Sequence, residues 1–184
     1  FDLQKAEEHY NQLLSNNTDI FMAFGVVNNV IISQQSNYPK PTILFGAVNQ
    51  DLVEVNLEES TSGIPNFTYL IESESYEEDL AKFKELTNFK KVGIIIERQI
   101  TEILPVRELF DKELAALSAD YELIPFETVA DITSNLDSVD AVYLAGGFFL
   151  PDSAIKILAD VFIEKELPSF TSTGIQDVQM GLLA

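Results

Sequence analysis

The chain has 184 residues, 46% of them hydrophobic, which is enough apolar material for one substantial core or two small lobes. Thirty acidic residues against 11 basic ones give a formal net charge of −19, so the chain should be repelled by nucleic acid and by anionic lipid. The lack of cysteine excludes disulfides, thiolate metal sites and a cysteine nucleophile, and no apolar run reaches the about 20 residues of a membrane span.

The first part of the chain predicts helices and strands in alternation. Apolar residues spaced three and four apart indicate helices, and short unbroken apolar runs indicate buried strands. By these signals we expect helices over 1–14 and 28–35, buried strands over 19–24 and 41–48, and a short strand over 68–71. Gly63 and Pro65 lie within 49–70, which is therefore predicted to be an irregular connection.

The same alternation continues in the second part of the chain. Ser75 with Glu78 three residues later forms a capping box, and Pro105 and Pro151 suit the first turns of later helices. Pro125 donates no backbone hydrogen bond, so its strand should lie near a sheet edge. We expect strands over 91–96, 121–126, 141–145 and 167–172, a short helix over 132–136, and the beginning of a last helix in 174–184.

This order of elements predicts an α/β fold with two Rossmann-like lobes. Unbroken apolar strands that alternate with helices indicate parallel sheets covered on both faces. We expect a partial first lobe over 1–70, a second lobe over 71–172, and the start of a crossover back to the first lobe over 173–184. The first block opens on a helix with no preceding strand, which predicts a chain trimmed at both ends and an incomplete first lobe. A dimer contact or a swapped element would cover the exposed edge of that lobe.

Ligands of open parallel sheets gather beyond the carboxyl ends of the strands. The turns that follow apolar strands here are 25–29, 49–51, 97–99, 146–149 and 171–174. Each has two interpretations: a glycine can bring a ligand close to the backbone or only permit a tight turn, and Asn28 can bind a ligand or cap the next helix. Arg98 can pair with a ligand carboxylate or with one of the chain's own acidic residues.

Catalytic and cofactor patterns are poor in this sequence. The sole histidine, His9, falls on a helix expected at the surface, and no metal cluster has usable spacing. The stretch "AGGFFLPDS" (145–153) matches no dinucleotide fingerprint, and no phosphate-loop motif occurs. The turns are suited to grip a small molecule and not to transform one, so we expect no catalytic residue, metal or cofactor.

Six segments, in their order and spacing, resemble those of a known family. They are "AFGVVNN" (23–29), "LFGAVNQD" (44–51), "SGIPNFTYL" (62–70), "KKVGIIIERQI" (90–100), "VDAVYLAGGFF" (139–149) and "LPSFTSTGIQDVQMGLLA" (167–184). The family is that of the ABC transporter substrate-binding proteins of the tryptophan or aromatic amino-acid type, which have a type I periplasmic-binding fold. The segments over 139–147 and at the end of the chain are the most characteristic of this family.

The resemblance implies a two-lobed device that captures a small-molecule solute, an amino acid among the candidates, in the cleft between its lobes. It implies an ABC permease as partner and a periplasmic or cell-surface location, with a lipid anchor as one form of attachment. Glycines would let backbone amides approach the solute, asparagine and threonine would donate hydrogen bonds, Arg98 would supply a charge, and Phe148 would stack on it. The ligand-binding residues implied are Gly25, Val26, Asn28, Asn29, Asn49, Gln50, Glu97, Arg98, Gly146, Gly147, Phe148 and Thr173.

The departures from the family pattern all fall on these turns. The family's "TPAA", "TDP", "TDN" and "NPS" turns are replaced here by 27–29, 49–51, 145–147 and 97–99, whereas the strands keep their pattern. The architecture is therefore carried over more firmly than the ligand. Two alternatives stay open: a sensory or partner-binding domain of the same fold with a degenerate cleft, and a cytosolic α/β enzyme.

Overall fold

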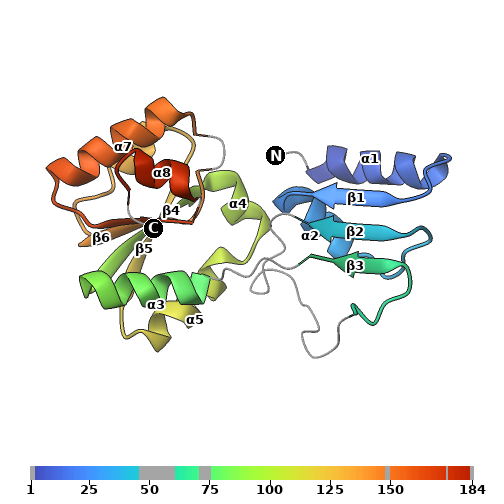
Figure 1. The fold of residues 1–184 in the computed structure, drawn as a ribbon, viewed down its shortest axis with the longest axis horizontal. Coiled ribbons are helices and arrows are strands. Elements are labelled where there is room, and N and C mark those ends of the chain that lie inside the picture. The colour runs from blue at the N-terminus through green and yellow to red at the C-terminus, as the bar shows by residue number, and fades with distance from the viewer. Residues whose placement is uncertain (1–2, 46–60, 71–75, 148–149, 173, 183–184) are drawn as a thin grey trace. The chain divides into compact units, whose positions relative to one another are not determined.

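A computed structural model describes residues 3–45, 61–70, 76–147, 150–172 and 174–182. The chain divides into two compact units, Phe1–Ser75 and Tyr76–Ala184 (Figure 1). Both units are α/β, and every strand pair in them is parallel, which confirms the predicted fold class. The expected lobe boundaries at 70 and 172 stay a prediction. Ser75, the expected helix cap, lies outside the described residues.

The first unit holds one small sheet in the order β1-β2-β3. Its elements are α1 (Leu3–Ser15), β1 (Phe21–Phe24), α2 (Val26–Ser33), β2 (Thr42–Phe45) and β3 (Phe67–Tyr69). The helices and strands of this part occur within a few residues of where the apolar spacing predicted them, and residues 46–48 and 71 of the expected strands lie outside the described residues. Tyr38 links α2 to β3: its ring stacks on that of Phe67 with the centroids 4.1 Å apart, and its hydroxyl donates to the Ile32 carbonyl at 2.7 Å.

The core of the first unit lies on one face of its sheet. Tyr10 of α1 and Ile32 of α2 pack with Phe21 on that face. Side chains alternate along a strand, so Met22 and Phe24 point to the opposite face, where they are 68% and 64% exposed. The prediction of a buried strand over 19–24 is therefore wrong for Met22 and Phe24, because the two described helices share one face of the sheet, and Ile20, which precedes β1, is also exposed.

The second unit contains a larger sheet in the order β5-β4-β6-β7. Its strands are β4 (Lys91–Glu97), β5 (Asp120–Phe126), β6 (Ala141–Leu144) and β7 (Ser169–Thr171). Its helices are α3 (Tyr76–Thr87), α4 (Arg98–Ile103), α5 (Val106–Ala116), α6 (Val129–Thr133), α7 (Asp152–Glu164) and α8 (Ile175–Gln179). The strand that contains Pro125 lies at the edge of the sheet, as the missing backbone donor predicted.

Two details of the second unit differ from the expectation. The residues 97–99 do not form an open turn, because Glu97 ends β4 and α4 begins at once with Arg98. The helix expected over 132–136 begins earlier, at Val129, because Thr128 caps it. The Thr128 side chain accepts from the Asp131 backbone N–H, and the Asp131 carboxylate accepts from the Thr128 backbone N–H.

The central strands of the second unit are covered on both faces, as parallel strands require. Figure 1 shows α7 on one side of the sheet and α3 and α5 on the other. On the α7 side, Leu158 and Phe162 pack with Leu144, and Leu182 from the tail joins the same cluster. On the other side, the Phe170 ring lies 5.3 Å from the Phe83 ring and 6.0 Å from the Tyr143 ring. This packing fixes β4 and β6 side by side, with their carboxyl ends at one rim of the sheet.

Candidate functional site

The order of strands reverses direction between β4 and β6. The chain leaves β4 for β5 on one side of it and leaves β6 for β7 on the opposite side. In open parallel sheets the crevice for a ligand lies at such a reversal, beyond the carboxyl ends of the two strands. Ile95 of β4 pairs with Leu144 of β6, so Glu97 and the Gly146–Gly147 turn follow at the same level. The structure therefore brings two of the predicted turns together at the reversal point.

Glu97 and the glycine turn are joined directly. The Gly147 backbone N–H donates to Glu97 Oε1 at 2.8 Å, within a buried setting in which Glu97 is only 8% exposed. Its second oxygen, Oε2, is buried and has no hydrogen-bond partner among the described residues. A Cβ on Gly146 would overlap this oxygen, so the Glu97 carboxylate would have to move to admit a side chain at position 146.

Gly147 has a separate reason to be glycine. Its φ of +103° lies in the left-handed region, and a Cβ there would approach the Leu144 side chain to 3.3 Å. Its carbonyl accepts from the Leu150 backbone N–H at 2.9 Å, which closes the turn before α7. The Gly146–Gly147 pair thus makes a tight turn and also presents a backbone amide to a carboxylate.

Arg98 points toward the edge strand β5. Its Nε forms an ion pair of 3.1 Å with Glu127 Oε1, and its Nη2 donates to the Pro125 carbonyl at 3.2 Å. The alternative in which Arg98 pairs with one of the chain's own acids is therefore the one seen in this structure. A contact between Arg98 and a solute stays a prediction.

The end of β7 carries a buried acid that the sequence analysis missed. Asp177 of α8 is 8% exposed, and its Oδ2 accepts from the Thr171 hydroxyl at 3.0 Å. The neighbouring Ser172 hydroxyl donates to the Leu144 carbonyl at 3.2 Å and so ties β7 to the end of β6. The signal available in the sequence was an acidic residue in the first turn of a helix that directly follows a strand.

In the first unit, the predicted turn at 25–29 lies at the carboxyl ends of β1 and β2. Gly25 has a φ of +85° and leads straight into α2, which begins at Val26. The side-chain amide of Asn28 donates to the Phe24 carbonyl at 2.9 Å, and that of buried Asn29 donates to the Phe45 carbonyl at 3.3 Å. Both asparagines thus tie α2 to the strand ends, but neither caps the helix, because the N-cap position is Gly25 and no side chain bonds to the first helical N–H groups.

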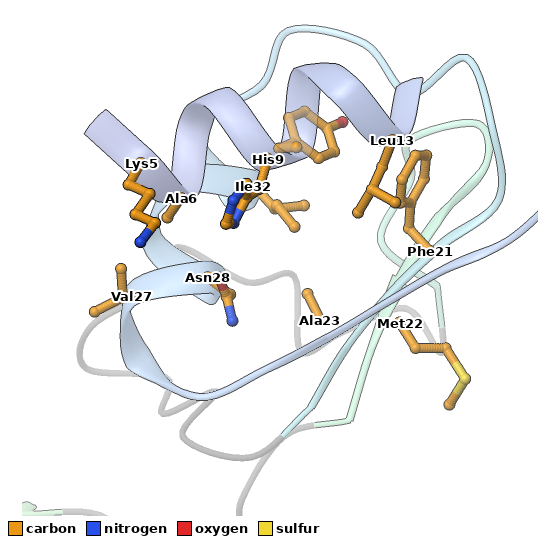
Figure 2. A pocket seen from close by; sticks show the side chains of 11 residues that line it. Lys5, Ala6, His9, Leu13, Phe21, Met22, Ala23, Val27, Asn28 and Ile32 are labelled. Atoms are coloured by element: carbon orange, nitrogen blue, oxygen red, sulfur yellow. The ribbon is translucent and has the colours of Figure 1, made fainter. Parts of the chain in front are cut away.

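Asn28 also lines a hollow of about 360 Å³ in the first unit. Figure 2 shows Lys5 and His9 of α1 beside it, with Ala23 of β1 and Ile32 of α2 on its apolar side. The hollow borders β1, which is an edge strand of its sheet. The sequence analysis did not find it, because its lining comes from three elements that no motif connects.

Four of the predicted site residues cannot be placed with the rest. Asn49, Gln50, Phe148 and Thr173 lie outside the described residues. Across the ranges that are described, no group of three or more His, Asp or Glu side chains is positioned to hold a metal ion. Within the same ranges, no helix is both long and apolar enough to cross a membrane.

Three solved structures share this architecture over 98% of the chain. They are a conserved domain protein from Vibrio cholerae (17% identity, TM-score 0.67), an ABC domain from Streptococcus pneumoniae in complex with L-Trp (15%, 0.64), and CD0873 from Clostridium difficile, a substrate binding protein with adhesive properties, in its ligand-free, open form (13%, 0.58). The chain spans 62% of the length of each of these. Neither a protein-family model nor a curated protein sequence matches it.

These likenesses confirm the resemblance that the six sequence segments indicated, at the level of fold. The identities of 13–17% carry the architecture and leave the ligand open. The chain has the α/β fold of ABC-type substrate-binding proteins, with a parallel sheet in each of its two units.

Proposed function

We propose that the protein is the solute-binding component of an ABC-type uptake system and acts outside the cytoplasm, in the periplasm or at the cell surface. The observation that carries this proposal is the meeting of Glu97 with the Gly146–Gly147 turn at the strand-order reversal of the second unit. Ligands of parallel α/β sheets bind at this position, and the fold is that of proteins that bind solutes. A lipid anchor and an ABC permease are the attachment and the partner that this role implies.

The described turns favour binding over chemistry. They offer a carboxylate, backbone amides and side-chain amides, which are groups that orient a polar solute. His9, the sole histidine of the chain, is exposed on α1 of the first unit. The described residues of these turns do not form the pair of a general base and a nucleophile that nucleophilic catalysis needs.

In this proposal a solute bridges the turns of the two units and stabilises one closed arrangement of them. A ligand shifts a conformational equilibrium only by its difference in affinity for the two states, so contacts to both units are what favour closure. The closed form would then be read by the permease. The turns at Gly25 and at Gly147 are the proposed contributions of the two units, with Asn28, Asn29 and Glu97 beside them.

Thermal denaturation of the full-length protein with a panel of amino acids, sugars and nucleosides tests the proposal. A solute at one hundred times its Kd stabilises the folded state by about 2.7 kcal/mol and should raise the melting temperature by several degrees. If no member of the panel raises it, the proposal fails and the alternative of a partner-binding domain with a degenerate cleft gains support.

Two glycine variants make the test specific to the site. Gly147→Ala forces a Cβ into the left-handed region next to Leu144 and should abolish the solute-induced stabilisation. Gly63→Ala imposes similar backbone strain at φ +70°, but a Cβ there meets nothing within 4 Å, and this turn precedes β3. Gly63→Ala should therefore lower the melting temperature without altering the shift that the solute produces.

A further inference from the structure

The hollow beside β1 has a basic end, although the chain as a whole is acidic. Lys5 and His9 of α1 both line it and lie one helical turn apart on the same face of that helix. Glu8, which lies between them in the sequence, accepts from the Gln4 side chain at 3.1 Å. None of the described residues that line the hollow is acidic, in a chain with 30 acidic and 11 basic residues. The lining therefore favours a negatively charged ligand.

The first unit has few basic residues, and most of them lie at this hollow. Lys5, His9 and Lys40 are the basic residues of the segment 1–75. Lys40 has a structural role, because its ammonium group donates to the carbonyls of Leu13 and Asn16, at 3.2 and 2.7 Å, and so caps the end of α1. Figure 2 shows the Lys5 and His9 side chains extending from α1 toward α2, over the hollow. Both carry N–H groups that can donate to an anion there.

The rest of the lining is largely apolar. Ala23 of β1 and Ile32 of α2 are each 6% exposed and belong to the core of the first unit. Leu13 and Met22 lie at the opposite end of the hollow from Lys5 (Figure 2), and they are 42% and 68% exposed, so apolar surface remains for a ligand to cover. The volume of about 360 Å³ falls within the range of small-molecule sites. A basic end beside an apolar wall matches an anion that carries a short hydrocarbon chain.

We propose that this hollow is a second binding site of the protein, for a free aliphatic carboxylate. The carboxylate accepts charge-assisted hydrogen bonds from the Lys5 ammonium group and the His9 imidazole N–H. Its hydrocarbon chain lies along Ala23 toward Leu13 and Met22. The inference goes beyond the proposed solute site and does not rest on it, because the described lining of the hollow comes from α1, β1 and α2 of the first unit alone.

A series of unbranched carboxylates from propanoate to hexanoate tests this in the full-length protein by NMR. With ¹³C-methyl-labelled alanine, hexanoate should shift the resonances of Ala6 and Ala23 saturably, while Ala154 in α7 of the second unit stays unchanged. The affinity should rise about threefold to fourfold with each added methylene, since each one buries apolar surface. 1-Hexanol, which has the chain but no charge, should bind at least about tenfold more weakly than hexanoate.

Two lysine variants make the test specific to the basic end of the hollow. Lys5→Gln should weaken hexanoate binding about tenfold, because a charged donor to the carboxylate is lost. Lys5 is exposed, so this variant should keep the melting temperature of the wild type. Lys82→Gln is the matched control: Lys82 is also an exposed lysine on a helix, paired with Glu85 at 2.7 Å, but it lies on α3 of the second unit. That variant should bind hexanoate as the wild type does.

The outcomes decide this inference separately from the proposed function. It is overturned if hexanoate causes no saturable shift of Ala6 and Ala23, if the affinity does not depend on chain length, or if 1-hexanol binds as tightly as hexanoate. An unchanged affinity in Lys5→Gln overturns it too. None of these results bears on the solute site of the proposed function, which the panel of amino acids, sugars and nucleosides tests through Gly147→Ala.

Discussion

The Tyr143 hydroxyl donates a hydrogen bond of 2.7 Å to Oδ2 of Asp79 and so joins the central strand β6 to α3. Tyr143 is fully buried, and burial followed by the nearby Asp79 charge raises the pKa of its phenol well above the ordinary value of 10.0. The phenol therefore stays protonated and acts as a donor across the physiological pH range. This bond fixes α3 on the face of the sheet that carries the Phe170 ring, against which Phe83 of α3 packs.

Removing that hydroxyl should destabilise the second unit. We expect Tyr143→Phe to lower the free energy of unfolding by about 1.5–3 kcal/mol, because a hydrogen bond to a charged group is lost in a buried setting. Tyr121→Phe is the matched control: its hydroxyl also donates to a carboxylate, Oδ1 of Asp111 at 2.7 Å, but at a half-buried site. That variant should lose less than about 1 kcal/mol in urea denaturation. Equal losses would show that burial does not set the strength of these bonds.

Gly146 should be intolerant of a side chain because of Glu97. We expect Gly146→Ala to destabilise the protein by about 1–3 kcal/mol, since its Cβ would overlap Glu97 Oε2. Glu97→Ala removes the obstacle, so the double variant should be more stable than the sum of the two single changes predicts by at least about 1 kcal/mol.

Gly93→Ala provides the control for this coupling. A Cβ at Gly93 would meet the Ile124 and Val139 side chains instead, so its effect should add to that of Glu97→Ala. Additivity at Gly146, or coupling at Gly93, would contradict the contact geometry of the turn.

Asp131 should make the stability of the folded protein decrease at low pH. Its Oδ2 accepts the backbone N–H groups of Glu127 and Thr128 and the Thr128 hydroxyl, and these bonds, the Glu127 N–H first, hold the pKa of Asp131 below its ordinary value of 3.8. A carboxyl group whose pKa is lowered on folding stabilises the fold above its unfolded pKa, and this contribution is lost as the pH falls through the folded pKa. Asp131→Asn should therefore lower the melting temperature at neutral pH and match the wild type near about pH 2.

The carboxyl resonance of Asp131 gives the direct measurement. Its NMR titration midpoint should lie below 3.8 in the wild type and move upward in Thr128→Val, which removes one donor and leaves two backbone donors in place. A midpoint at or above 3.8 would refute the assignment of this capping interaction.

The two faces of β1 should respond differently to truncation in the 184-residue chain. Phe21 is 4% exposed and packs against Tyr10 at a ring distance of 5.4 Å, so Phe21→Ala should cost about 3–5 kcal/mol. Phe24, on the same strand, is 64% exposed, and Phe24→Ala should cost less than about 1 kcal/mol. Hydrogen exchange of the β1 and β2 amides reports both. A large cost at Phe24 would mean that another element covers this face.

The sequence predicted the order of elements well because the strands of both sheets are short unbroken apolar runs that alternate with helix patterns. The edge position of β5 followed from one missing donor at Pro125. The exposed face of β1 was not predicted, since Met22 and Phe24 are as apolar as their buried neighbours and only the placement of helices distinguishes them. The α4 helix was missed because polar residues at 97–99 suit a turn as well as a first helical turn.

The candidate site was predicted only in part. The strand ends located Glu97 and the Gly146 turn, but the bond from the Gly147 N–H to Glu97 depends on the register of β4 and β6, which no local pattern encodes. The pairing of Arg98 with Glu127 depends in the same way on the β5 edge. The Thr171–Asp177 contact was missed because it joins a strand end to a helix several residues later.

An NMR titration of the backbone amides with a solute that raises the melting temperature tests the central claim most directly. That claim is that the turns at the carboxyl ends of the parallel strands hold the solute. We expect the amide resonances of Gly25, Gly146 and Gly147 to shift together and saturate at one solute per protein, while Gly93 inside β4 stays unchanged. Shifts confined to the Lys5 and His9 side of the hollow in Figure 2, or shifts absent from these three glycines, would contradict it.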